Sequence, residues 1–222
     1  MSLLQQRDAP LADLRRFQLA HLALRVHGED ICRGLAAMAP GDTERGQALG
    51  RLWAIYQAGL RGHDSSEDGL CWPFVVERDP GFAPIQADME RQHKHLAELL
   101  STAAIALERM AANADRSSIA DSVESMDTLV KAAEQHFLDE EDRALPRLAV
   151  VFTADDMAAL ERRRRTLPKE MRATFLAAEE GAARRMGAHD LIASLPLSVR
   201  INLALRWRRR YRKLVGPILA IR

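Results

Sequence analysis

One sparse pattern occurs twice in the first 150 residues, as HDSSEDGLCWP from His63 to Pro73 and as HFLDEEDRALP from His136 to Pro146. Each stretch contains a histidine, a glutamate four residues later, a second acid directly after that glutamate, and a proline ten residues after the histidine. Residues i and i+4 project from the same face of an α-helix, so each stretch can direct an imidazole and a carboxylate at one point. A single pair of this kind is typical of a solvated helix face, whereas two matching pairs indicate a shared site.

The spacing of two further histidines extends the repeat. His21 precedes His63 by 42 residues, and His93 precedes His136 by 43 residues. The first half is therefore related to the second by an offset of 72 or 73 residues. This spacing predicts two helical hairpins, each with one histidine on its first helix and a His-x-x-x-Glu pattern on its second. Packing the hairpins about a pseudo-twofold axis would bring these side chains to one centre.

Apolar periodicity predicts four long helices in this part of the chain. We expect the first to begin after an Asp8 N-cap with Pro10 in its first turn, and the second and fourth to end at the prolines of the repeated pattern. The expected ranges are 10–38, 42–73, 84–112 and 118–146. Short turns between them favour an all-α fold, an up-down-up-down four-helix bundle with extra C-terminal helices packed on it.

The charge distribution divides the chain into two parts. Residues 1–150 carry 16 Lys/Arg and 24 Asp/Glu, net −8, whereas residues 151–222 carry 16 Lys/Arg and 7 Asp/Glu, net +9. We therefore expect a bundle domain over 1–150 and a basic helical extension over 151–222. The segment RWRRRYRK from Arg206 to Lys213 is interpreted as a complement to the acidic bundle in preference to a surface for nucleic acid or anionic membranes.

Several protein classes are disfavoured by composition. There is no uncharged apolar run of about 18 residues or more, which argues against a transmembrane span. The N-terminal stretch MSLLQQRDAP lacks the pattern of a secretory signal, and Cys32 and Cys71 form no CxxC motif. We expect a cytoplasmic protein with reduced cysteines.

Four imidazoles and two carboxylates meeting inside a bundle need partners, because burying unpaired polar groups costs several kcal/mol. Metal ions satisfy them, and two ions do so better than one because a carboxylate can bridge. Mixed imidazole and carboxylate ligands on bundle helices favour iron or manganese. Zinc prefers four-coordinate sites and would leave ligands over.

The order His, HxxxE, His, HxxxE on four helices resembles the hemerythrin-like (HHE cation-binding) family. The matching stretches are FQLAHLALR, GHDSSEDGLCWP, RQHKHLAELL and EQHFLDEEDRALP, within about residues 10–150. The basic extension is similar to extensions on some bacterial members. The resemblance implies a carboxylate-bridged non-haem diiron centre bridged by Glu67 and Glu140. Its implied terminal ligands are His21, His63, His93 and His136.

The sequence departs from the oxygen-carrying members at Ala97, where they have a second histidine one turn after the third-helix histidine. The missing imidazole leaves room for water, for a carboxylate such as Asp64, or for an exogenous ligand. Peroxide, NO or redox chemistry, including catalase-like peroxide disproportionation, is therefore favoured over reversible O2 transport. The alternatives are a non-enzymatic iron-binding or iron-sensing module, and a metal-free interaction protein that uses its basic tail.

The remaining polar residues near these motifs are assigned structural roles. Of the other histidines, His27 and His95 are expected at the surface, and His189 is given no role. Tyr56 is expected to pack in the core. The acids Asp64, Asp68 and Glu141 are interpreted as solvated helix ends in preference to ligands of the site or supports for its ligands.

Overall fold

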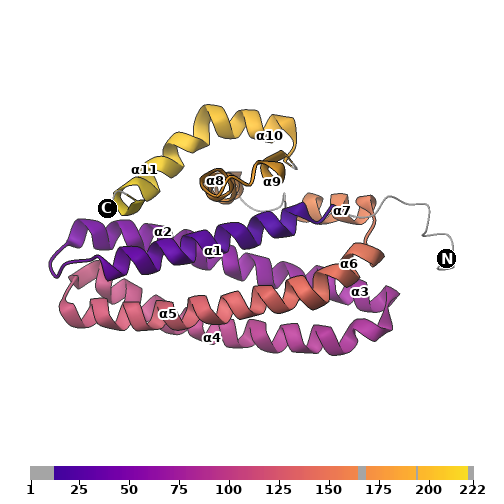
Figure 1. Cartoon of the computed structure of the whole chain (residues 1–222), viewed down its shortest axis with the longest axis horizontal. Coiled ribbons are helices and arrows are strands. Elements are labelled where there is room, and N and C mark those ends of the chain that lie inside the picture. Colours follow the sequence, from indigo (N-terminus) through magenta and orange to yellow (C-terminus); the bar gives the residue numbers. More distant parts are fainter. Residues whose placement is uncertain (1–12, 165–168, 194, 220–222) are drawn as a thin grey trace.

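Four long helices make up most of the chain before residue 150. The computed structural model describes residues 13–164, 169–193 and 195–219, and this part of the chain is helical and contains no β-strand. The long helices lie side by side, with the α1–α2 and α4–α5 connections at one end and the connection into α4 at the other (Figure 1). The all-α prediction is confirmed. The long helices are α1 (Arg15–Ala36), α2 (Thr43–Ser66), α4 (Ala83–Asn113) and α5 (Arg116–Asp139).

Side-chain caps fix where two of these helices begin. The Asp42 carboxylate accepts a hydrogen bond from the Arg45 backbone N–H at 3.1 Å, so α2 begins where the sequence predicts. The Asp115 carboxylate accepts from the Ser118 N–H at 2.8 Å, so α5 begins slightly earlier than expected. The predicted cap Asp8 and Pro10 lie outside the described residues.

The prolines of the repeated pattern do not end their helices, which corrects the sequence-based prediction. A π-helical turn, η1 (Glu67–Cys71), follows α2 directly and leads into α3 (Trp72–Arg78). A second π-helical turn, η3 (Glu140–Ala144), joins α5 to α6 (Leu145–Val151) in the same way. Each proline falls in the first turn of the short helix that follows, where no intrahelical partner is required for its missing N–H.

Two apolar clusters lie inside the bundle and leave a polar layer between them. The larger includes Leu60, Leu96 and Phe137, and the smaller contains Trp72 and Met89. The charged half of each repeated pattern falls between these clusters in sequence and in space. The polar centre is therefore enclosed by apolar packing along the bundle axis.

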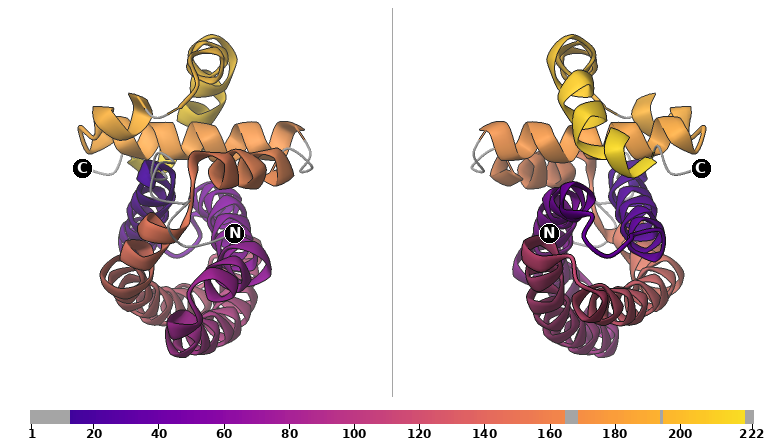
Figure 2. Two further views of the ribbon diagram at one scale, coloured as in Figure 1. Left: turned by 90° about the vertical axis from the view of Figure 1, so that its right-hand side faces the viewer. Right: turned by 90° about the vertical axis from the view of Figure 1, so that its left-hand side faces the viewer.

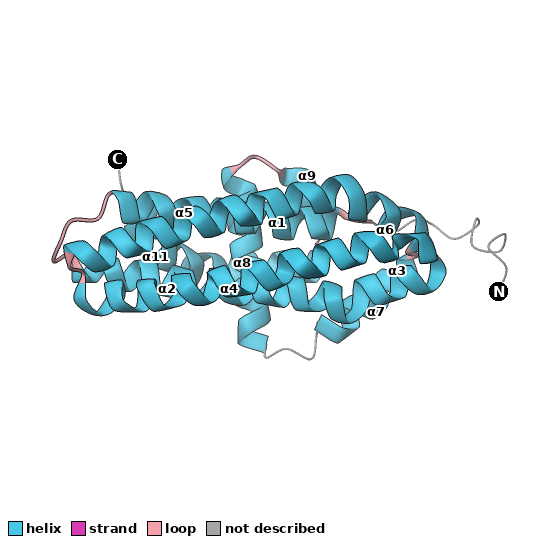
Figure 3. Ribbon diagram, turned by 90° about the horizontal axis from the view of Figure 1, so that it is seen from below, coloured by secondary structure: helices cyan, strands magenta, loops and turns pink. Residues whose placement is uncertain are grey.

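The C-terminal helices form a layer on the α1–α2 side of the bundle (Figure 2). Helix α8 (Lys169–Arg185) crosses the bundle helices, and Figure 3 shows this crossing from below. Helix α11 (Arg208–Leu219) packs against α1, α2 and α8. The other elements of the layer are α7 (Ala154–Arg164), α9 (His189–Ala193), α10 (Leu197–Asn202) and the π-helical turn η4 (Leu203–Trp207). None of the described helices combines the length and apolar character needed to span a bilayer.

Buried polar contacts attach this layer to α1. Asp30 of α1 is fully buried and accepts hydrogen bonds from Arg185 of α8, one of them at 2.7 Å. His27, also on α1, donates from Nδ1 to the Ala23 carbonyl and accepts at Nε2 from the Tyr211 hydroxyl of α11. His27 is 3% exposed, so its predicted surface position is wrong. The C-terminal layer covers the face of α1 that a bare bundle would leave in solvent.

The basic segment of the C-terminal layer divides into paired and exposed residues. Arg208 pairs with Glu180 of α8, at 2.8 Å from Nε to the nearer carboxylate oxygen, rather than with the bundle itself. Arg206, Arg209 and Arg212 are exposed. The preference for charge complementation over a binding surface in this segment stays a prediction.

The two buried tyrosines provide a matched test of the docking of α11. Replacing Tyr211→Phe leaves the His27 Nε2 acceptor buried without a partner, and we expect it to lower the free energy of unfolding by about 1–3 kcal/mol. Tyr56 is equally buried but its hydroxyl makes no hydrogen bond with a described residue, so Tyr56→Phe should change stability by less than about 0.5 kcal/mol. Denaturant unfolding of both variants measures the difference. Equal losses would show that the His27–Tyr211 contact does not stabilise the fold.

Candidate metal centre

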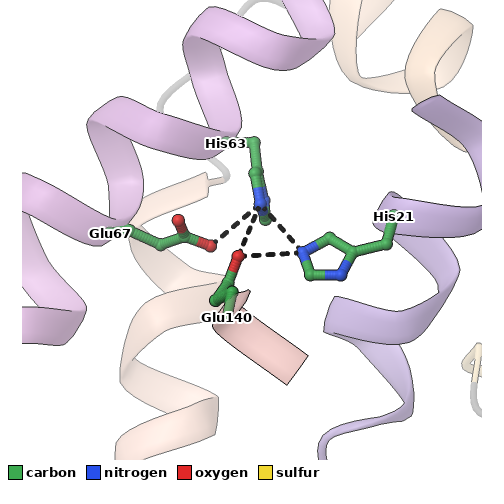
Figure 4. A group of neighbouring side chains, drawn as sticks. All are labelled: His21, His63, Glu67 and Glu140. Atoms are coloured by element: carbon green, nitrogen blue, oxygen red, sulfur yellow. Dashed lines mark hydrogen bonds and ion pairs between the residues drawn. The ribbon is translucent and has the colours of Figure 1, made fainter. Parts of the chain in front are cut away.

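The six polar residues of the predicted site come together from the four long helices of the bundle and from the π-helical turns that follow α2 and α5. Each side chain is nearly or fully buried, and none belongs to the C-terminal layer. Figure 4 shows His21, His63, Glu67 and Glu140 pointing toward one another. The contributors are His21 from α1, His63 from α2, Glu67 from η1, His93 from α4, His136 from α5 and Glu140 from η3.

The first histidine pair joins the two helices of the first hairpin. His21 Nε2 and His63 Nε2 lie 3.0 Å apart. Glu140 Oε2 lies 3.1 Å from His21 Nε2 and 3.5 Å from His63 Nε2. Glu67 Oε1 lies 3.1 Å from His63 Nε2, so two imidazoles and two carboxylates converge at this point.

The second histidine pair repeats this arrangement in the second hairpin. His93 Nε2 and His136 Nε2 lie 3.2 Å apart. The other oxygen of Glu67, Oε2, lies 3.5 Å from His93 Nε2. Glu140 Oε2 lies 3.7 Å from His136 Nε2. Glu67 therefore directs one oxygen at each histidine pair.

The outer nitrogens of two imidazoles are held by carboxylates. His21 Nδ1 lies 2.7 Å from Glu141 Oε1, and His93 Nδ1 lies 2.7 Å from Asp68 Oδ1. The interpretation of these two acids as merely solvated helix ends is therefore wrong. A carboxylate at Nδ1 fixes the proton there and leaves the Nε2 lone pair facing the centre, as in carboxylate–histidine–metal triads.

The two hairpins exchange these supports. Asp68 belongs to the first hairpin and holds His93 of the second, whereas Glu141 belongs to the second and holds His21 of the first. The second acid of each repeated pattern thus orients the lone histidine of the other hairpin. The sequence does carry a signal for this role, because an acid directly follows each motif glutamate in both copies of the repeated pattern.

Both motif glutamates begin a π-helical turn. The Glu67 carbonyl accepts from the Trp72 N–H and the Glu140 carbonyl from the Leu145 N–H, five residues on in each case. An i→i+5 turn is wider than an α-helical turn and is frequent at functional sites. The turn lets consecutive acids point to different partners, the first to the centre and the second to an outer nitrogen.

Several buried carboxylate oxygens of the centre lack hydrogen-bond partners. Both carboxylate oxygens of Glu67 and of Glu140, together with Asp64 Oδ1, are buried without a hydrogen-bond partner. Such groups cost about 1–3 kcal/mol each, and more when charged. Three groups of side chains place their ligand atoms within 4.8 Å of one another, and together they comprise all six predicted residues and Asp64. The donor set therefore fits metal cations.

The protonation of the centre reflects crowded charges. Burial and the neighbouring Glu140 hold the pKa of Glu67 well above its usual range. Burial opposes ionisation of Glu140 too, but His21 and His63 hold its pKa well below the usual range. Although burial alone would lower it, contact with Glu140 and Glu141 raises the pKa of His21 to about 9. Without a cation, the centre therefore retains protons near neutral pH.

Asp64 and Ala97 were both considered above in connection with an open ligand position, and the structure places them in different surroundings. Asp64 is buried, contrary to its favoured interpretation, and its carboxyl belongs to one ligand group with His63 and His136. Burial and the nearby Asp68 raise the pKa of Asp64 to about 8. Ala97 is exposed. On the same helix, Gln92 Oε1 lies 2.9 Å from the outer nitrogen, Nδ1, of His136.

The surface position expected for His95 and the core position expected for Tyr56 are confirmed, and the absence of a role for His189 stays a prediction. His95 and His189 are exposed. Tyr56 is buried in the main apolar cluster, as expected for core packing.

A family model described as the hemerythrin HHE cation binding domain matches residues 13–148, which include all six side chains of the centre. No curated protein matches the chain, and no solved structure does.

Adding a transition-metal ion to protein treated with a chelator should release protons and raise stability. A pH of 7.5 is below the pKa of His21, which is about 9, so His21 holds a proton at both ring nitrogens, and Glu67 with its raised pKa also holds one. Metal binding should therefore release about one or two protons per chain. As the pH rises toward about 9, apparent affinity should increase, and above that pH fewer protons should be released and the increase should level off. Free ion at 100 times its dissociation constant should add about 2.7 kcal/mol of stability.

A pH-stat and denaturant unfolding measure the two quantities, with Mg²⁺, which prefers oxygen ligands, as the control ion. Equal responses to Mg²⁺ and Fe²⁺ would count against an imidazole-containing site.

Proposed function

This chain belongs to the family of hemerythrin HHE cation-binding domains, and on that premise we propose that it is a non-haem diiron protein that reacts with or senses O2, peroxide or NO. In this proposal Glu67 and Glu140 bridge two iron ions. The terminal ligands are His21, His63, His93 and His136.

The position of Glu67 carries the proposal. Its Oε1 is directed at the pair that contains His63 and its Oε2 at the pair that contains His93. One ion would leave one of these oxygens, and the histidine pair it faces, without a partner. Two ions bridged by the carboxylate satisfy both, and the near-duplicate supports at Asp68 and Glu141 favour two equivalent ligand sets.

Bound iron would supply redox chemistry toward O2, peroxide or NO. The protein's own residues prepare the centre for it. Asp68 and Glu141 hold the Nδ1 protons of His93 and His21, which keeps the inner nitrogens free to donate electron pairs. The apolar cluster around Trp72 and Met89 excludes water from one side. The Asp64 carboxyl, beside His63 and His136, can hold a proton within the centre.

The alternatives use the same residues differently. A non-enzymatic iron-binding or iron-sensing module would exploit the stabilisation of the bundle by metal, which the unpartnered buried carboxylate oxygens support. A metal-free interaction protein would have to tolerate those oxygens, which disfavours it. Catalase-like peroxide turnover and a cytoplasmic location stay predictions.

We expect purified protein reconstituted aerobically with ferrous iron to hold about two irons per chain and to show an absorption band that the metal-free protein lacks. Metal analysis and an optical spectrum test this directly. Well under one iron per chain after reconstitution would refute the diiron proposal. About one iron per chain would refute the bridging role of Glu67.

Peroxide consumption separates a reactive centre from a storage or sensing site. If the centre turns over peroxide, His63→Ala should reduce the rate at least tenfold because one ion loses an imidazole. His95→Ala, a histidine exposed on α4, serves as the control and should keep the full rate. Iron-loaded protein without turnover would favour the non-enzymatic module.

The supporting acids should tune metal affinity without being ligands. Replacing Asp68→Ala or Glu141→Ala removes the acceptor for one Nδ1 proton, and we expect each change to weaken iron binding about 10–100-fold. Asp142→Ala, an exposed acid in the same turn as Glu141, should leave affinity unchanged. Chelator competition measures all three. Losses as large for Asp142→Ala would indicate a general charge effect instead.

A further inference from the structure

A cavity of about 310 Å³ lies where α8 crosses the α1–α2 face, outside the metal centre but against one of its histidines. Leu24, Ile55 and Phe175 form apolar walls, and the exposed Gly62 and Gly69 lie at its edge. The volume falls within the range of small-molecule sites, roughly 300–1,000 Å³. The crossing of α8 over the bundle, which roofs the cavity, is seen in Figure 2.

Small side chains keep this space open. Ala20 and Ala23 of α1, Gly59 of α2 and Ala178 of α8 all line the cavity. A Cβ at Gly59 would meet Leu24 and Phe175 only at 3.5 and 4.0 Å, so this wall is not closed by backbone packing. The C-terminal layer therefore covers the bundle here without filling the gap.

The pseudo-twofold relation between the hairpins identifies what is missing from the cavity. Gln92 directly precedes His93 and contacts the outer nitrogen of His136 at 2.9 Å. The equivalent residue, directly before His21, is Ala20, which has no side chain to reach His63. His63 is accordingly the one imidazole of the four whose Nδ1 makes no hydrogen bond with a described residue, and it lines the cavity.

A second polar group in the cavity lacks a partner. Tyr56 is 2% exposed, lines the cavity, and its hydroxyl makes no hydrogen bond with a described residue. Buried tyrosine hydroxyls usually find a partner. His27 also lines the cavity, but both of its ring nitrogens are already bonded.

Charge restricts the ligand further. Among the described residues that line the cavity, Glu179 is the one carboxylate, and Arg16 pairs with it at 3.0 Å. None of these described lining residues is a lysine or an arginine. The described lining therefore offers an anion no cationic side chain, which favours an uncharged ligand over fatty acids and other carboxylates.

We propose that this cavity binds an uncharged, mainly apolar molecule whose carbonyl oxygen accepts a hydrogen bond from His63 Nδ1–H, in the place that Gln92 Oε1 takes at His136. The apolar body lies between α1, α2 and α8. Because His63 also faces the metal centre through Nε2, the ligand acts on that centre through the imidazole. The assignment of the proton to Nδ1 rests on the proposed function, in which Nε2 holds metal.

Three naphthalene derivatives of similar size test the ligand class on the full-length protein as purified. Equilibrium dialysis should give one saturable site for 2-acetonaphthone, with 2-ethylnaphthalene binding about 3–10-fold more weakly because it lacks the acceptor oxygen. 2-Naphthoate should bind more weakly than the ketone. Absence of saturable ketone binding, equal binding of the hydrocarbon, or tightest binding of the carboxylate would each overturn the proposal.

Two substitutions test the place of binding. Ala20→Gln supplies the missing acceptor, and Ala178→Phe fills the apolar part; each should weaken ketone binding at least tenfold. Ala97→Gln and Ala97→Phe, the same changes at an exposed position of α4, should leave it unchanged. Phe175→Ala, which opens the roof without filling the cavity, should weaken binding less than Ala178→Phe. Unchanged ketone binding in both cavity variants, with their helical circular dichroism retained, would overturn the proposal.

Iron measured on the same samples separates this proposal from the previous one. Ketone binding in a protein that cannot be loaded with iron would refute the diiron centre and leave the cavity site standing, without the metal-based assignment of the His63 proton. Full iron loading without ketone binding would refute the cavity site alone.

Discussion

The buried carboxylates of Glu67 and Glu140 are the constraint on which the rest of the bundle depends. Their oxygens make no well-directed hydrogen bond and lie between two apolar clusters. A carboxylate in such surroundings must be neutralised by a proton or by a cation. The raised pKa of Glu67 shows the first solution. The lowered pKa of Glu140, which lies against His21 and His63, keeps that carboxylate ionised, and the four inward-facing imidazoles provide for a metal cation.

This constraint makes the two hairpins dependent on each other. Each pairs its own two histidines, but the acids that orient the lone histidines come from the opposite hairpin. One hairpin alone would therefore have an unsupported imidazole and an unneutralised glutamate. The apolar faces of the helices bring the halves together, and the polar layer fixes how they fit, because a shift of one residue between the hairpins would separate Asp68 from His93 and Glu141 from His21.

The sequence was sufficient for the helical class and for bringing His21, His63, Glu67, His93, His136 and Glu140 together, because the i, i+4 rule and the histidine spacing act locally and repeat. The sequence-based prediction failed where contacts between residues far apart in the chain determine the structure. The prolines predict helix ends, but the π-helical turns before them continue the helical path into α3 and α6. His27 was placed in solvent because only the docking of α11 buries it. Asp68 and Glu141 were misinterpreted because their partners lie in the other half of the chain.

The duplicated centre is not truly symmetric, and the difference originates at Ala20. His136 is locked on its outer side by an amide from within the bundle, whereas His63 faces a space whose roof belongs to the C-terminal layer. One half of the centre is thus enclosed by the bundle alone, while the other borders residues of α8 that are not among the six residues of the centre. Changes in the C-terminal layer can therefore alter the surroundings of one half of the centre and leave those of the other half as they are.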